Sequence, residues 1–285
     1  MNLQNIFNQI EKVDPEVFEK MDTRRSAMRK FASASGKVAL ASLPFAIGSM
    51  FKTAYGRSSS TQDVFHVLNF ALTLEYLEST FYNAGVGTSG LIPSGDLPSI
   101  TKIRDHESKH VTFLTNAISA AGGTPVVFTP AQFDLTAHGT FPTVLSDYGV
   151  FLAVAQTFED TGVRAYKGQA PNLQGSANRP YLTAALEIHS VEARHAAHIR
   201  EIRRGNGLLV PAGVVVKPYI TLNQSGIATS AVQGNYNGEE LTSQAGVNII
   251  GIGGNSFIDA NAASEAFDEP LDEATVLSLV NPFFA

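Results

Sequence analysis

One pair of residues with a fixed spacing occurs twice in this chain, and it constrains the fold more than any other feature. The pair is a glutamate followed three positions later by a histidine, at Glu107–His110 and again at Glu192–His195. A single glutamate in an apolar stretch precedes each pair, Glu75 by 32 residues and Glu159 by 33 residues. The two halves are offset by about 84 residues, which indicates an internal repeat.

Each of these residues lies in a segment with helical spacing of its apolar side chains. The predicted helices cover 61–83, 98–118, 143–167 and 180–204, and glycines follow the second helix of each half at Gly122 and Gly207. Residues three apart lie on one face of a helix. The glutamate and the histidine of each pair can therefore point into the same core.

The connections between the helices predict how the helices are arranged. The loops around 85–97 and 168–179 are short, whereas 124–142 contains three prolines and no sustained period. Short loops make antiparallel helix pairs, and a long crossover lets the second pair start at the same end as the first. We therefore expect an all-α fold, a four-helix bundle over 57–207 with one long crossover.

The segment 208–285 has a different composition. Short β-prone runs at Val214–Val216, Tyr219–Leu222 and Val247–Ile252 stand among Gly, Asn, Ser and Thr, and a helical pattern returns only at Asp272–Val280. We expect an irregular or partly β tail that packs on the bundle or at a subunit contact.

Four glutamates in one core predict a metal site. Buried carboxylates repel one another and resist desolvation unless cations compensate them. Four carboxylates with two neutral imidazoles carry four negative charges, which two divalent cations neutralise. Oxygen-rich ligands with one imidazole per ion suit iron(II) or manganese(II) better than copper or structural zinc. A metal-free polar core with neutralised or ion-paired carboxylates stays open as the alternative.

This order of residues resembles the ferritin-like superfamily of dimetal-carboxylate proteins over about 61–207. The resemblance implies that Glu75 and Glu159 are the single-helix carboxylates. It implies that Glu107 and Glu192 are bridging carboxylates, and that His110 and His195 are terminal ligands. The segments Leu74–Glu78 and Ala266–Leu271 also resemble a bacterial branch of ferritin-like domains related to desiccation-related proteins. This branch has no single agreed activity.

Two kinds of residue beside the predicted ligands have open roles. Glu78 lies one turn after Glu75, and its counterpart in the repeat is Gly162. It could be an extra ligand, a proton carrier, an iron-entry residue or a solvated or salt-bridged carboxylate. Tyr82 and Tyr166 each follow a glutamate by seven residues, about 10 Å along a helix axis. They are therefore hydrogen-bonded core tyrosines or redox relays, not ligands.

The other histidines receive no support from the repeat. His189 and His198 extend the stripe of the fourth helix, but the second helix has Arg104 and Phe113 in the equivalent places. We interpret three further histidines as ordinary polar residues, namely His66, His106 and His138. Ligand histidines need outer hydrogen-bond partners. The sequence does not identify them; Asp105 and Asp160 are only plausible.

The N-terminal segment 1–56 predicts the location of the protein. Thr23–Arg25 is followed by further basic residues, a small-residue run at 38–51 and Ala54–Gly56, which resembles a twin-arginine export signal. The resemblance implies export to the periplasm or cell envelope, with association at the envelope or membrane surface through the N-terminus. A retained basic helical segment is the alternative.

Composition limits the partners. The chain has no Cys, which excludes disulfides and thiolate sites, and a net charge of −6 without a basic face beyond the N-terminus argues against nucleic acid. No run of 18 apolar residues occurs, which argues against a buried membrane span.

Two classes of function fit these features. The first is an oxidoreductase acting on O2 or H2O2, because no pocket for an organic substrate is recognisable: iron would suggest ferroxidase or oxidase action, and manganese catalase-like dismutation. The alternative is a structural or stress-protective envelope assembly protein whose site is structural or empty. We also expect a homo-oligomer, but a closed iron-storage cage is disfavoured by the flanking segments.

Overall fold

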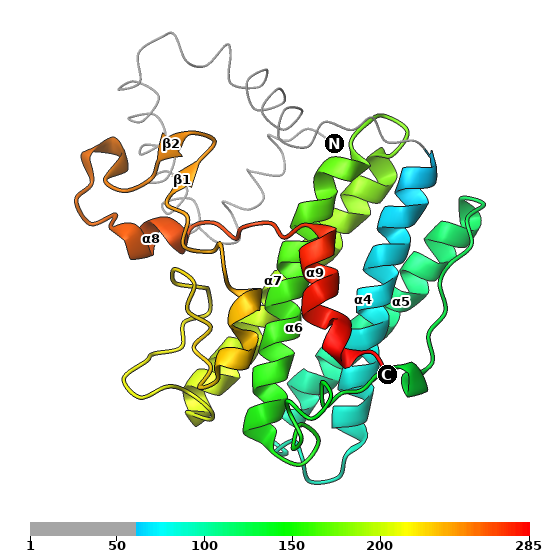
Figure 1. The fold of residues 1–285 in the computed structure, drawn as a ribbon, viewed down its shortest axis with the longest axis horizontal. Coiled ribbons are helices and arrows are strands. Elements are labelled where there is room, and N and C mark those ends of the chain that lie inside the picture. Colours follow the sequence, from blue (N-terminus) through cyan, green and yellow to red (C-terminus); the bar gives the residue numbers. More distant parts are fainter. Residues whose placement is uncertain (1–60) are drawn as a thin grey trace, which may run out of the picture. The chain divides into compact units, whose positions relative to one another are not determined.

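The computed structural model describes residues 61–285, so the predicted export signal lies outside the described residues. Four long helices form a bundle (Figure 1): α4 (Thr61–Gly87), α5 (Leu97–Ala120), α6 (Tyr148–Gln169) and α7 (Arg179–Asn206). Helix α4 packs along α5, and α6 packs along α7. The predicted all-α bundle with one long crossover, residues 121–147, is confirmed.

Local signals set the ends of these helices. Helix α6 begins five residues later than predicted, because the Asp147 carboxylate accepts hydrogen bonds from the backbone N–H groups of Gly149 (2.8 Å) and Val150 (3.1 Å). Such a cap fixes the first turn of a helix. Helix α7 ends as expected at Gly207, whose φ of 63° lies in the left-handed region that favours glycine.

The crossover is held in place by the C-terminal residues. It contains the short 3-10 helix η1 (Pro130–Gln132), after which Phe133 forms a β-bridge with Phe284. The Asp134 N–H donates to the Phe283 carbonyl at 2.8 Å. The crossover is thereby joined to the C-terminal residues.

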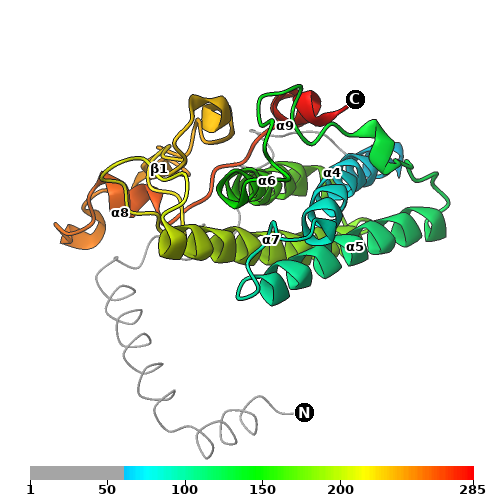
Figure 2. The ribbon, with the colours of Figure 1, turned by 90° about the horizontal axis from the view of Figure 1, so that it is seen from below.

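Helix α6 lies at the centre of the structure. Nineteen of its 22 residues are buried, so it is covered on every side, unlike a surface helix with one apolar stripe. Figure 2 shows α4 and α6 in one layer, α5 and α7 in the next, and α9 on the outer side of the α4–α6 layer. The C-terminal tail therefore supplies a further layer over α6.

The tail is mostly irregular, as predicted, but its β content is smaller than the sequence suggests. Its elements are η3 (Ser230–Asn235), β1 (Ser243–Gln244), β2 (Val247–Asn248), η4 (Ile252–Gly254), α8 (Ala260–Ser264), α9 (Glu273–Val280) and η5 (Asn281–Phe283). The expected helix at 272–280 is confirmed as α9, with Asp272 as its cap. The runs Val214–Val216 and Tyr219–Leu222 are not strands. Their buried residues, Val216 and Ile220, are covered by neighbouring side chains without a partner strand.

Buried arginines attach the tail to the bundle. Arg164 of α6 contacts the Glu239 carboxylate at 2.6 Å and donates to the Asn235 carbonyl at 2.6 Å. Arg200 of α7 pairs with Asp160, which also accepts a hydrogen bond from the Tyr236 hydroxyl at 2.8 Å. These groups are nearly inaccessible to solvent, so the tail is an integral part of the fold.

Two apolar clusters make up most of the core of the bundle. One contains Phe81 and Tyr82 with the first half of α6, and the other contains Leu68 and Tyr166 with the first half of α7. The glutamate side chains of the repeat are buried among these apolar residues. None of the helices within 61–285 has the length and apolar character needed to cross a bilayer.

Candidate metal centre

The six side chains predicted as ligands converge in the middle of the bundle. Each helix contributes one glutamate, and α5 and α7 add a histidine each. The four glutamates have no exposed surface. The structure therefore brings together every member of the predicted set: Glu75, Glu107, His110, Glu159, Glu192 and His195.

These residues form two groups of four that share two members. The first group is Glu75, Glu107, His110 and Glu192, and the second is Glu107, Glu159, Glu192 and His195. Within each group the potential ligand atoms lie within 4.8 Å of one another. Because the glutamates of both Glu-x-x-His pairs belong to both groups, they are placed to bridge two ions.

The first group surrounds one ring nitrogen. His110 Nδ1 lies 3.2 Å from Glu75 Oε2, 3.1 Å from Glu107 Oε2 and 3.2 Å from Glu192 Oε1. Four ligands at about 2.1 Å from a tetrahedral ion are about 3.4 Å apart, and neighbouring octahedral ligands about 3.0 Å. The observed spacing matches what one small divalent ion requires.

The second group repeats this arrangement more loosely. His195 Nδ1 lies 2.9 Å from Glu107 Oε1, 3.2 Å from Glu159 Oε2 and 3.8 Å from Glu192 Oε2. Both histidines thus turn the same ring nitrogen toward the carboxylates. Glu107 and Glu192 each direct one oxygen to each group, as a bridging carboxylate must.

Buried oxygen atoms without hydrogen bonds test whether metal ions fit here. Among the described residues, Glu107 Oε1 and both carboxylate oxygens of Glu192 are buried without a hydrogen-bond partner. The histidine Nδ1 atoms approach them without the alignment of a hydrogen bond. Buried unsatisfied oxygens are costly, and divalent cations would satisfy these. The residues present therefore fit a pair of ions.

The sequence comparison agrees with this architecture. Residues 63–204 match the family described as the ferritin-like domain. The chain belongs to the ferritin-like superfamily. The matched range contains all six of these side chains and nearly the whole of the four bundle helices. Among the curated proteins, none matches the chain.

Without metal, protons balance part of the negative charge of the ferritin-like site. Burial raises the pKa of the Glu75 and Glu159 carboxyls. Burial alone would lower the pKa of His110 and His195, but the surrounding carboxylates outweigh it and raise both well above the usual value. Burial would also raise the pKa of Glu192, but the two imidazoles hold it at about 2. Protons thus occupy the place that cations would take.

Two tyrosines form hydrogen bonds that link the two halves of the ferritin-like bundle. Tyr82 of α4 donates to Glu159 Oε1 of α6 at 2.5 Å, and Tyr166 of α6 donates to Glu75 Oε1 of α4. Burial raises the pKa of both tyrosines, so each keeps its proton. The interpretation as hydrogen-bonded core tyrosines is confirmed; which glutamate each one binds was not predicted.

His106 is a site residue that the sequence analysis missed. Its Nδ1 lies 2.9 Å from His195 Nε2, and the two rings stack with centroids 5.2 Å apart. Interpreting it as an ordinary polar histidine was therefore wrong. The repeat could not reveal it, because the equivalent residue on α7 is Val191. Its only signal is its position next to Glu107.

Neither Asp105 nor Asp160 is an outer partner of a ligand histidine. Asp105 pairs with Arg104 near the surface, and Asp160 pairs with the buried Arg200. Asp160 follows Glu159 directly, and Asp105 lies two residues before Glu107. A step of one or two residues turns a helical side chain to another face.

The other histidines stay outside the site, as predicted. His189 Nδ1 lies 3.0 Å from the Val163 carbonyl, and His198 is exposed. His66 pairs with Glu273 at 2.8 Å, and His138 lies 3.3 Å from the carboxylate of Asp134.

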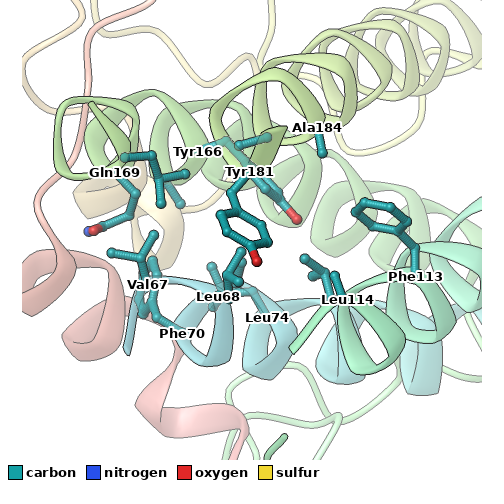
Figure 3. A pocket seen from close by; sticks show the side chains of 15 residues that line it. Val67, Leu68, Phe70, Leu74, Phe113, Leu114, Tyr166, Gln169, Tyr181 and Ala184 are labelled. Atoms are coloured by element: carbon teal, nitrogen blue, oxygen red, sulfur yellow. The ribbon is translucent and has the colours of Figure 1, made fainter. Parts of the chain in front are cut away.

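An apolar pocket lies beside Tyr166 at one end of the ferritin-like bundle (Figure 3). It lies among α4, α5, α6, α7 and the short 3-10 helix η2 (Ala170–Leu173). Leu68, Leu114 and Tyr181 are among its walls. No pocket was recognisable in the sequence, because its walls come from five elements. It borders the tyrosine that binds Glu75.

Proposed function

We propose that this ferritin-like bundle holds two divalent metal ions, iron or manganese, and reacts with O2 or H2O2. One observation carries the proposal: two four-atom groups, each with one imidazole and three carboxylates, share Glu107 and Glu192. A pair of bridged redox-active ions would supply two electrons to O2 or H2O2, or would take two electrons from a second H2O2 molecule.

The tyrosines orient the terminal carboxylates for this role. Tyr166 holds Glu75 Oε1, which leaves Oε2 facing His110, and Tyr82 holds Glu159 Oε1, which leaves Oε2 facing His195. Each terminal glutamate can therefore offer one oxygen to one ion. Outer hydrogen bonds of this kind fix ligand orientation.

His106 fixes the ring orientation of His195. When the N–H of His195 is on Nε2, it donates to His106 Nδ1 and leaves the Nδ1 lone pair directed at the carboxylates. His110 has no such partner among the described residues, so the two groups differ. The halves of the repeat are therefore similar in ligands but unequal in their surroundings.

The apolar pocket favours O2 over H2O2 as the oxidant. Its accessible lining surface is apolar, and dry apolar cavities accept apolar molecules. Hydrogen peroxide would lose its hydrogen bonds to water on entering such a pocket. O2 would lose none, and the pocket would bring it to Tyr166, next to the proposed centre.

The test combines metal identity with two oxidant assays. Purified protein is analysed for iron and manganese, and then assayed for O2 uptake and for peroxide decay. We expect the metal-loaded protein to consume O2 or peroxide, with O2 consumed faster than peroxide. The double variant Glu107→Ala/His195→Ala should consume neither. A loaded protein inert toward both would contradict it.

A purely structural metal is the second candidate, and the complete burial of the four glutamates favours it. Ions in this position would join four helices. Under this alternative, metal removal lowers the melting temperature while the loaded protein is inert toward both oxidants.

Export to the periplasm or cell envelope is a further proposal, supported by the twin-arginine-like sequence at Thr23–Arg25. Cell fractionation of the full chain and of an Arg24→Lys/Arg25→Lys variant tests it. Retention of the variant inside the cell is expected, whereas equal export of both proteins would contradict it.

A further inference from the structure

Glu78 is a buried carboxylate that the six-residue site does not use. It lies one turn after Glu75 on α4, and only 5% of its surface is exposed. Within residues 61–285, no side chain or backbone N–H donates a hydrogen bond to it. A buried carboxylate without a partner is costly unless a proton or a cation accompanies it, so its position calls for a charge-compensating ligand.

The Glu78 carboxylate faces the bridging glutamate across a gap left by a glycine. A methyl group added to Gly162 would lie 3.4 Å from Glu78 Oε1 and 3.6 Å from Glu192 Oε2. The two oxygens thus border the same small space. Gly162 stands where the repeat would place the counterpart of Glu78, so one half supplies the carboxylate and the other supplies the room.

A small pocket connects with this gap on the side away from the histidines. Its walls come from α4, α6 and α9, with Leu77, Phe158 and Val280 among them. Glu78 is the one charged residue in its walls. Helices α5 and α7, which carry both histidines, lie in the layer beyond (Figure 2).

We propose that Glu78 is a metal-uptake ligand, which receives a divalent cation in the α4–α6–α9 pocket and passes it to Glu192. The proposal rests on the dinuclear centre proposed above and assigns its route of loading. Four carboxylates already balance two divalent ions, so a fifth carboxylate attracts one more cation than the centre keeps. That charge surplus suits a transient position rather than a permanent one.

Rotation of the Glu78 side chain completes the transfer. Metal–oxygen distances are about 2.0–2.2 Å, and Glu78 Oε1 and Glu192 Oε2 border the same gap beside Gly162. A rotated Glu78 side chain would therefore carry its cation toward the bridging carboxylate. Gly162 is essential to this route, because any side chain there would fill the space through which the cation moves.

The test measures metal uptake by the full-length metal-free protein. Mn²⁺ is added to the wild type and to Glu78→Gln, and free Mn²⁺ is followed by electron paramagnetic resonance until uptake ends. We expect both proteins to reach two ions per chain, with Glu78→Gln loading about tenfold more slowly, because local charge raises cation on-rates by about that factor or more. Glu187→Gln, a change at an exposed residue of α7, is the matched control and should load at the wild-type rate.

A second variant tests the route independently. Gly162→Ala keeps every carboxylate but occupies the gap, and it should also load slowly. Wild-type uptake rates in both variants would overturn the proposal. A final content below two ions in Glu78→Gln would also overturn it, in favour of a permanent ligand. If the wild type itself takes up no metal, the proposed dinuclear centre is contradicted. That result differs from slow loading and from a reduced final metal content.

Glu78→Gln is not expected to unfold, because the amide has the shape of the carboxyl. The melting temperature of its metal-free form should be equal to or above that of the wild type, since an unpaired buried carboxylate is removed. A lower value would show that Glu78 has a stabilising partner and would count against the proposal.

Discussion

Tyr82 donates a 2.5 Å hydrogen bond to Glu159, a residue 77 positions later in the chain. Tyr166 makes the reciprocal bond to Glu75. Each half of the repeat therefore orients the terminal carboxylate of the other half. The two helical hairpins are joined through the candidate metal centre as well as through apolar packing.

Removal of one of these hydroxyls should weaken metal binding. We expect Tyr82→Phe to lower affinity for one of the two ions about 10-fold, because an outer hydrogen bond to a ligand contributes about that much. Tyr148→Phe removes a comparable bond to Asp96, outside the candidate centre, and should leave affinity unchanged. Competition titrations with a metal-binding dye measure both; equal affinity in all three proteins would contradict the orienting role.

His106 should affect one ion more than the other. His106→Phe keeps an aromatic ring against His195 but removes the hydrogen-bond acceptor. We expect one step of a two-step Mn²⁺ titration to weaken about 10- to 100-fold, with the other step nearly unchanged. Equal weakening of both steps would show a general loss of structure instead.

Metal binding should release protons, and affinity should rise with pH. The raised pKa values of His110, His195, Glu75 and Glu159 mean that the metal-free site carries protons near neutrality. A metal ligand must lose its proton, so lower pH favours the protonated, metal-free form. Calorimetric titrations in buffers with different ionisation enthalpies should give a release of at least one proton per ion. A binding enthalpy independent of the buffer would contradict this.

The buried arginines should matter for stability. Arg200→Met leaves the Asp160 carboxylate without its cation in a dry environment, and removal of one member of such a pair costs about 3–5 kcal/mol. For a domain of this size the melting temperature should fall by about 10 °C. Arg204→Met, in which an exposed pair with Glu201 is lost, should change it by less than about 2 °C. Similar melting temperatures for the two variants would show that the internal pair is not stabilising.

The sequence predicted the bundle and the six converging residues because two independent patterns agree. The repeat pairs Glu75 with Glu159 and Glu107–His110 with Glu192–His195. Helical spacing then places each set on one face. Neither pattern needs knowledge of the tertiary contacts.

What the sequence did not predict depends on differences between the halves and on tertiary contacts. His106 has no counterpart in the repeat, so a symmetric interpretation passes over it. The tyrosine partners depend on how far α4 is shifted along α6, which spacing within a single helix cannot give. Val214–Val216 has a β-like composition, but in the structure its apolar residues pack without a partner strand. In this run the β-like composition indicates burial, but it does not indicate backbone hydrogen bonding to a neighbouring strand.

The metal content of the protein tests the central claim most directly. The full chain is purified from metal-replete cells, and its metal content is measured together with anomalous scattering from crystals. The account predicts two ions per chain, one beside His110 and one beside His195, joined by Glu107 and Glu192. A protein with no metal at these positions after growth in iron and manganese would contradict it.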